Sequence, residues 1–238
     1  MILRENVSFV MMVRNEEYWI ELALRPLIHT FIPILIMDTG SEDATVDIIE
    51  EISDAYPQIK LFANPRLNAS ELGRARGDLA KEATTSWIFV VDGDEIYRTD
   101  DLHRILDDEY PDDMLAGFTT MQNLEFENGS EWVRATNKYS AHRIHKQNAK
   151  WVGEYPFEST EHFRHEGNSK FYYYQTRNGS KCHGYHARYA MRSSLDNETF
   201  FRTEKIGYFN NEASGPWFDL FDEIGTPIYN NPYKRETD

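Results

Sequence analysis

Two carboxylates one residue apart form the most chemically suggestive group in the 238-residue sequence. Asp92-Gly93-Asp94-Glu95 directly follows the apolar run at residues 86–91. A glycine between two acids permits a tight turn in which both carboxylates reach one ligand, and it lets a bulky ligand come close. Mg²⁺ and Mn²⁺ take one or two carboxylates and complete their coordination with water and substrate phosphates. Asp94 and Asp92 are therefore candidate metal ligands, and the alternative is a solvated acidic turn.

Polar groups also follow two earlier apolar runs. Asp38 ends the second run, and a carboxylate there can accept the N3–H of a uracil or thymine ring. Arg14, Asn15 and Glu16 end the first run, where Asn15 and Glu16 can border the same base. The alternatives are local: D-T-G-S is favourable turn chemistry, and acids are favoured at helix N-termini.

The elements that must position these groups alternate between strand and helix. Strands are predicted at residues 7–13, 31–37, 59–63 and 86–91, and helices at residues 16–27, 43–52 and 71–83. This alternation predicts an α/β fold, with a mostly parallel, Rossmann-like sheet flanked by helices. Ligands of such sheets bind at the carboxyl ends of the strands. The polar groups that end the first, second and fourth strands should therefore converge on one site.

The pattern changes after about residue 115. Strands are predicted at residues 116–126, 139–145 and 171–176, and a helix at residues 187–209, in a mixed and aromatic-rich region. We expect a single domain over residues 1–238. Its parts would be a nucleotide-binding half at 1–115, an acceptor half at 116–190, and a C-terminal helix and tail at 191–238.

Composition excludes several classes of protein. The 40 acidic and 25 basic residues give a net charge of −15. This charge would repel the phosphates of a nucleic acid, so we expect no nucleic-acid partner. The single cysteine, Cys182, excludes an internal disulfide and a Cys-rich zinc site. No apolar run reaches the roughly 18–20 residues of a membrane span, and no secretory leader is visible. We expect a cytoplasmic protein without an integral membrane segment, either free or peripheral to a membrane.

The motifs together resemble glycosyltransferase family 2, of the GT-A fold, and its bacterial members in particular. The matching segments agree in order and spacing over residues 6–98: V-M-M-V-R-N-E-E, I-L-I-M-D-T-G-S-E-D-A-T, R-A-R-G-D-L-A and V-V-D-G-D-E. The resemblance implies a nucleotide-sugar donor and a divalent cation, Mn²⁺ or Mg²⁺. It implies that Asp38 holds the nucleobase, that Asp92 lies near the ribose or the metal, and that Asp94 binds the metal. Arg76 matches a family arginine that precedes an asparagine, a position held here by Gly77.

The second half supplies the candidate catalytic base. H-R-I-H-K-x-x-A-K-W-V-G-E-Y-P-F-E is similar to a segment that ends in a His-Glu pair in bacterial members, but here the histidine is replaced. Glu158 is the first candidate, Glu161 the alternative and Glu154 the third. A carboxylate base would take the proton of an acceptor hydroxyl as its oxygen attacks the anomeric carbon, which suffices for an inverting displacement. The alternative for each is a surface acid.

Two histidines are candidates for a further metal ligand. A neutral imidazole can ligate a metal, and family members often place a histidine after the acceptor-side strands, close to the diphosphate. His183 is the first candidate and His186 the alternative. Either could instead be a structural histidine.

The sequence thus predicts a metal-dependent glycosyltransferase. It would move a sugar from a UDP- or dTDP-linked donor to a hydroxyl of a glycan, a lipid-linked sugar or a protein. Two alternatives remain: a nucleotidyltransferase acting on a sugar phosphate, and a non-catalytic GT-A-like binding domain. The first would need a glycine-rich basic loop, and Arg14-Asn15-Glu16-Glu17 is not one. Nucleotide preference would separate all three.

Overall fold

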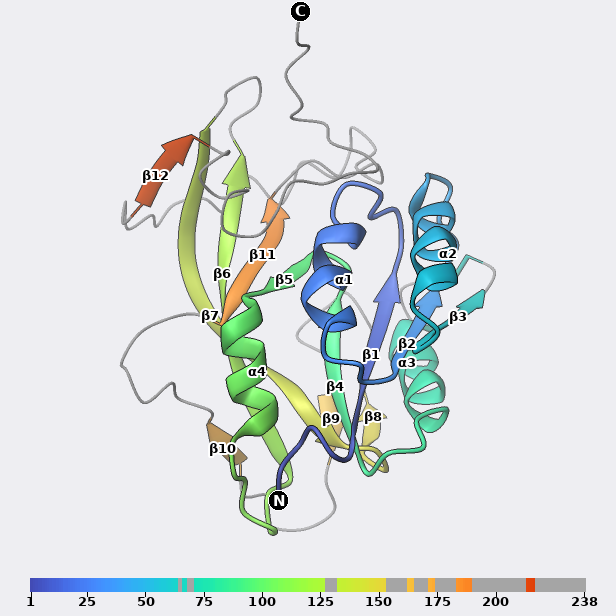
Figure 1. Ribbon diagram of the computed structural model, residues 1–238, viewed down its shortest axis with the longest axis vertical. Helices are drawn as coiled ribbons and strands as arrows, with labels where there is room; N and C mark the ends of the chain where they lie inside the picture. The colour runs from blue at the N-terminus through green and yellow to red at the C-terminus, as the bar shows by residue number, and fades with distance from the viewer. Residues whose placement is uncertain are drawn as a thin grey trace, which may run out of the picture.

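The computed structural model describes residues 1–63, 66–67, 71–126, 132–152, 162–164, 171–173, 183–189 and 213–216. Within these residues, one ten-stranded sheet has the order β3-β2-β1-β4-β7-β6-β11-β5, with β10 paired to β6 and β12 to β7. Helices flank this sheet (Figure 1). The predicted α/β class, with a mostly parallel central sheet, is confirmed.

The first half forms the strand and helix alternation that the sequence predicts. Strands β1, β2, β3 and β4 pair in parallel, with β1 between β2 and β4. Their bounds, and those of the helices between them, are β1 Val7–Val13, α1 Ile20–Ile28, β2 Ile34–Asp38, α2 Thr45–Ala55, β3 Ile59–Ala63, α3 Leu72–Lys81 and β4 Trp87–Asp92. The predicted helix at 16–27 begins later than expected, because residues 15–17 bond to a neighbouring loop instead.

Alternation of side chains along the strands divides the core between the two faces of the sheet. Phe9 and Met11 of β1 belong to one cluster, which includes apolar side chains of α1, α2 and α4 (Thr99–Asp107). Val10 and Met12 belong to the other cluster, which packs against α3. Figure 1 shows α1 and α2 in front of the sheet and α3 behind it. Each fully buried side chain of this kind contributes about 1.5–3 kcal/mol, so both faces stabilise the edge that carries the site.

The second half joins the first through one long strand. Strand β7 pairs antiparallel with both β4 and β6, and β11 lies between β6 and β5. The bounds are β5 Glu95–Tyr97, β6 Ala116–Phe126, β7 Trp132–Lys146, β8 Lys150–Val152, β9 His162–Arg164, β10 Phe171–Tyr173, β11 Gly184–Tyr189 and β12 Ala213–Pro216.

Several predictions for this half need correction. The strand expected at 139–145 runs from Trp132 to Lys146, because it pairs along its length with β6. The helix expected from residue 187 is wrong at 187–189, where β11 continues in the sheet, and its remainder lies outside the described residues. Within the described part of the chain, no helix is long and apolar enough to span a membrane.

Candidate active site

The ends of β1, β2 and β4 meet at one edge of the sheet, as the sequence predicts. In the parallel registers Val13 lies opposite Asp38, and Met12 lies opposite Asp92. Adjacent strands are about 4.8 Å apart, so the groups that follow these strands share one small region. The structure therefore brings the β1 end, Asp38 and the D-x-D turn together.

The loop after β1 is bound to the loop after β2. Asn15 has a positive φ of 54°, its N–H donates to Ser41 Oγ at 2.9 Å, and its Oδ1 accepts from the N–H of Glu42 at 2.8 Å. The N–H of Glu16 donates to Thr45 Oγ1 at 2.7 Å. These bonds hold residues 15 and 16 against the start of α2. Asn15 and Glu16 thus join the loop after β1 to the loop after β2. This structural role explains why α1 begins at Ile20 and not at residue 16 as predicted.

Asp38 organises the turn that follows β2. Its carboxylate is buried and accepts the N–H of Gly40 at 3.0 Å and of Ser41 at 3.1 Å. Gly40 has a φ of 97°, and a Cβ there would lie 2.5 Å from the Cα of Arg66. Only glycine fits this position without displacing backbone. Asp38 therefore stabilises the turn, which was the alternative role predicted from the sequence. Arg14 lies near this turn as well: its Nη1 is 3.5 Å from the carbonyl oxygen of Leu67, whose N–H donates to the carbonyl oxygen of Thr39.

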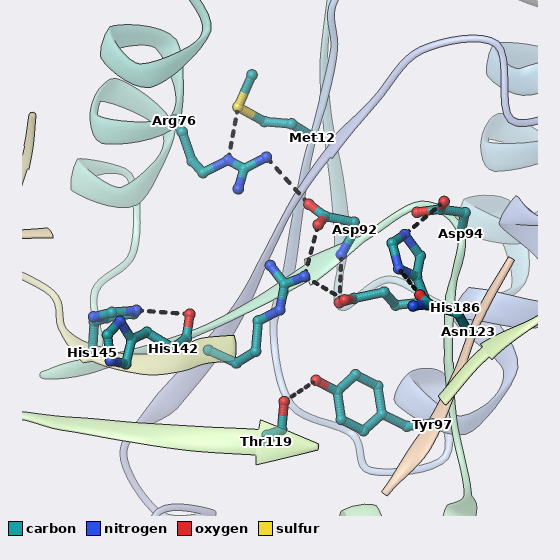
Figure 2. Close-up of polar contacts among 12 residues, drawn as sticks. Met12, Arg76, Asp92, Asp94, Tyr97, Thr119, Asn123, His142, His145 and His186 are labelled. Atoms are coloured by element: carbon teal, nitrogen blue, oxygen red, sulfur yellow. Dashed lines mark hydrogen bonds and ion pairs between the residues drawn. The ribbon is translucent and has the colours of Figure 1, made fainter. Parts of the chain in front are cut away.

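Two arginines hold Asp92 from different elements. Arg76 Nη2 of α3 lies 3.2 Å from Oδ1, and Arg143 Nη2 of β7 lies 2.9 Å from Oδ2 (Figure 2). Burial alone would raise the pKa of Asp92, but the positive charges of Arg143 and Arg76 outweigh it and hold that pKa well below its usual range. Asp92 is thus a permanent carboxylate. Of the neighbouring arginines on α3, Arg76 is 11% exposed and faces the site, whereas Arg74 is 89% exposed.

Gly93 allows close packing beneath the turn. A Cβ at this position would lie 3.0 Å from Glu16 Cγ and 3.0 Å from Val13 Cγ1. The side chain of Glu16 is buried there. The absence of a side chain at residue 93 therefore lets the β1 end and the D-x-D turn approach each other.

Asp94 and His186 form the arrangement best suited to a metal. Asp94 is 2% exposed, and its Oδ2 lies 3.0 Å from His186 Nε2. His186 Nδ1 lies 3.1 Å from Oδ1 of Asn123, to which it can donate a hydrogen bond, and this contact directs Nε2 at Asp94. Histidines that ligate metals are held in this way by a second hydrogen bond. The 3.0 Å contact is that of an ion pair between the two side chains. A divalent cation with ligands at about 2.1 Å would take the place of the shared proton and keep both groups nearby.

His183 has a different set of contacts. It is buried, and its Nδ1 accepts the N–H of Thr120 at 2.8 Å. Burial lowers the pKa of His183, so the ring is neutral and its proton is on Nε2. With one nitrogen accepting a hydrogen bond and the other protonated, the ring has no lone pair left for a metal. These contacts favour His186, the alternative, over His183.

A complete protein cage for a metal is absent from the described residues, among which no group of three or more His, Cys, Asp or Glu side chains is gathered. Asp92 is engaged by two guanidinium groups, so among the described residues Asp94 and His186 are the pair that fits a metal. Mg²⁺ and Mn²⁺ sites of this kind take their other ligands from water and substrate phosphates. The donor set therefore fits a metal that binds together with a diphosphate.

Three residues of this site were missed by the sequence analysis: Arg143, Glu95 and Asn123. Arg143 lies within the H-R-I-H-K segment, but nothing in that segment indicates which way its side chain points. Glu95 is completely buried and hydrogen-bonds to Arg143. Its position next to the D-x-D pair was the one available signal. Glu158, Glu161 and Glu154 lie outside the described residues, so the base remains a prediction.

Comparison with known protein families also identifies the chain. A model of the family Glycosyl transferase family 2 matches residues 8–200. A comparison with curated protein sequences gave no significant match.

Three solved structures are similar to part of this chain. S. aureus TarS 1–349 in complex with UDP-GlcNAc is 20% identical, with 52% of this chain and 36% of that chain covered and a TM-score of 0.38. The mannosyltransferase PcManGT from Pyrobaculum calidifontis, in complex with GDP-Man and Mn²⁺, is 18% identical, with coverages of 47% and 34% and a TM-score of 0.38. GalNAc-T7 with UDP, GalNAc and Mn²⁺ is 16% identical, with coverages of 52% and 24% and a TM-score of 0.44. The match thus spans about a quarter to a third of each of these longer chains.

The family match extends over most of the chain, from β1 through the D-x-D turn and into the second half. It confirms the resemblance predicted from the motifs and the glycosyltransferase class that the resemblance implied. The chain belongs to glycosyl transferase family 2.

Proposed function

We propose that the protein transfers a sugar from a UDP- or dTDP-linked donor to an acceptor hydroxyl, with Mn²⁺ or Mg²⁺ bound. The observation that carries this proposal is the pair formed by Asp94 and His186, 3.0 Å apart, at the edge where β1, β2 and β4 end. A buried carboxylate and an imidazole in this orientation can bind a divalent cation, and the oxygens of a diphosphate can supply the remaining ligands.

The nucleoside of the donor would lie over the ends of β1 and β2. Asp38 Oδ2 accepts the N–H groups of both Gly40 and Ser41, whereas Oδ1 accepts that of Ser41 and retains a second lone pair, which can accept the N3–H of uracil or thymine. Arg14, Asn15 and Glu16 stand beside this turn and would border the base. Hydrogen bonds between the two loops hold these residues in place, so the base would meet a preformed surface.

The diphosphate of the donor would lie between this edge and the D-x-D turn. Asp94 and His186 would hold the divalent cation, which supplies positive charge to the leaving diphosphate. Asp92 would lie near the ribose, and Gly93, which leaves room for Glu16 and Val13, would keep the turn close to the end of β1 where the nucleotide binds. Arg76 and Arg143 keep Asp92 ionised and in place, so this carboxylate is available as a fixed hydrogen-bond acceptor.

The chemical step is a single displacement at the anomeric carbon. The acceptor oxygen forms the new bond to that carbon while the bond to the diphosphate oxygen breaks, and the electron pair leaves with the diphosphate. The acceptor proton moves to a carboxylate base, for which Glu158 is the first candidate and Glu161 the alternative. One displacement inverts the anomeric configuration. The acceptor would be a glycan, a lipid-linked sugar or a protein.

Thermal melting with UDP, dTDP, GDP and ATP, each with and without Mn²⁺, tests the donor site. A ligand present at a hundred times its dissociation constant adds about 2.7 kcal/mol to the stability of the folded state. We expect UDP or dTDP to raise the melting temperature only when Mn²⁺ is present. If ATP raises the melting temperature and the three diphosphates do not, the result would indicate nucleotidyl chemistry. An unchanged melting temperature with all four nucleotides would contradict the proposed donor site.

A further inference from the structure

Arg143 connects the second half of the chain to the D-x-D turn. It lies on β7 and is largely buried, and its Nη2 contacts both Asp92 Oδ2, at 2.9 Å, and Oε1 of Glu95. Asp92 and Glu95 are the first and last residues of the four-residue turn. The guanidinium therefore ties together the two ends of the segment that carries Asp94.

An irregularity in β7 places Arg143 where it can do this. Ile144 pairs with Gly117 and His142 pairs with Phe118, so the register between β6 and β7 shifts at Arg143, which is the extra residue of a bulge. Such a bulge redirects a side chain that regular alternation would place elsewhere, and bulges are over-represented next to active sites. The bulge thus has a local consequence, which is to point Arg143 at the end of β4.

Glu95 holds both Arg143 and the first residue of the turn. Its carboxylate is completely buried, with Oε1 on Arg143 and Oε2 accepting the N–H of Asp92 at 3.3 Å. Burying a carboxylate is costly unless it is paired and hydrogen-bonded, and both conditions are met here. On the other side, Arg76 occupies Oδ1 of Asp92. The Asp92 carboxylate is therefore held at both oxygens by elements from the two halves.

We propose that Arg143 is a positioning residue for sugar transfer: anchored on Glu95, it fixes the Asp92 carboxylate and, through the turn, the orientation of Asp94 toward the metal and the donor diphosphate. This inference rests on the proposed function and extends it to a residue outside the nucleotide-binding half. Small misplacements of groups around a reacting centre are costly, because positioning supplies much of the rate in displacements of this type.

The test must separate positioning from folding stability. R143M alone would leave the carboxylate of Glu95 buried without its cation, and we expect a lower melting temperature. R143M/E95L replaces the pair by apolar side chains, an exchange that is often neutral for stability. If Arg143, anchored on Glu95, positions the site, this double variant regains the melting temperature but binds UDP or dTDP with Mn²⁺ about 10–100-fold more weakly, as for other residues that orient metal ligands. Because E95L also removes the acceptor of the Asp92 N–H, R143K, which keeps Glu95, assigns the loss to Arg143. R143K keeps the charge and should recover part of the affinity.

The matched control is R25M/E21L. This pair also joins an arginine to a buried glutamate, within α1, and it lies outside the D-x-D turn. We expect wild-type nucleotide affinity for the control. Wild-type affinity in R143M/E95L together with a recovered melting temperature would overturn the proposal. If the double variant does not fold, R143K decides: wild-type affinity in R143K together with an unchanged kcat for transfer overturns a positioning role, and a loss in either supports it.

Amide hydrogen exchange without any ligand separates failure of this inference from failure of the proposed function. If the wild type binds none of the tested nucleotides, the proposed function fails. The exchange rates of the amides at residues 92–95 then decide the positioning role alone. Faster exchange there in R143K, which keeps Glu95 as the acceptor of the Asp92 N–H, with unchanged rates in α2, supports the role. Wild-type exchange at all four amides contradicts it.

Discussion

The two halves of the molecule contribute to the site in different ways. In the first half, the acidic groups lie at the ends of buried strands: Asp38 is the last residue of β2, Asp92 is the last residue of β4, and Asp94 lies in the turn that follows. In the second half, Asn123, Arg143 and His186 lie within strands, and they reach the site only because β6, β7 and β11 pair as they do. The comparison shows that one site edge is encoded locally and the other depends on long-range pairing.

The pairing around His186 makes this dependence specific. Strand β11 lies between β6 and β5, so that His186 pairs with Asn123 on one side and with Glu95 on the other. A slip of one residue would turn His186 to the opposite face of the sheet. His183, three residues earlier, accepts a hydrogen bond from the backbone of β6 instead. Register therefore decides which histidine meets Asp94.

The largest effect is expected at Asp94. We expect D94N to abolish Mn²⁺-dependent nucleotide binding, because an amide retains the size of the side chain but loses the negative charge that a cation requires. Isothermal titration with UDP or dTDP and Mn²⁺ measures this, and far-ultraviolet circular dichroism checks the fold. D78N, on the exposed face of α3, is the control. Undiminished affinity in D94N would remove this residue from the metal site.

Removal of the catalytic base should spare the donor site altogether. We expect E158Q to lower kcat for transfer by about 10²–10⁴-fold while the dissociation constant of the donor nucleotide stays the same, because a general base contributes this much and acts only on the acceptor. Steady-state transfer rates and nucleotide titrations measure the two quantities. E161Q is the matched variant. If E158Q transfers at the wild-type rate and E161Q does not, the base is Glu161.

The two histidines provide a direct comparison of a ligand with a structural side chain. We expect H186Q to weaken Mn²⁺-dependent nucleotide binding by about 10–100-fold with little change in melting temperature. We expect H183A to leave the buried N–H of Thr120 without an acceptor and to lower stability by about 1–3 kcal/mol, with nucleotide affinity retained. Titration and urea unfolding of both variants measure the effects. The reverse pattern would restore His183 as the ligand.

The smallest effect is expected for base selectivity. We expect D38A to weaken UDP by about fivefold, the value of one ordinary hydrogen bond, and to weaken ADP less. The variant should also lose stability, because Gly40 and Ser41 lose the acceptor of their N–H groups. Competition titrations of UDP and ADP with Mn²⁺ measure the selectivity. Equal losses for the two nucleotides would indicate that Asp38 serves the turn alone.

Much of the first half follows from local pattern. Each of the four strands was placed to within a few residues, because a buried parallel strand is a continuous apolar run that ends in polar residues. The start of α1 was misplaced, since the hydrogen bonds of residues 15–17 go to the loop at residues 41–45, which is distant in sequence. Arg76 was expected as a candidate because it matches an arginine of the family motif.

The sequence by itself determined the order of the strands and helices, the polar groups at their ends and the family motifs, because these depend on residues that are near one another in the chain. Only the tertiary structure decided that Arg143 reaches Asp92, that Asp92 is held at both oxygens, and that His186 rather than His183 faces Asp94. The physical reason is that strand register and a bulge in β7 set these contacts, and both arise from pairing between segments far apart in sequence.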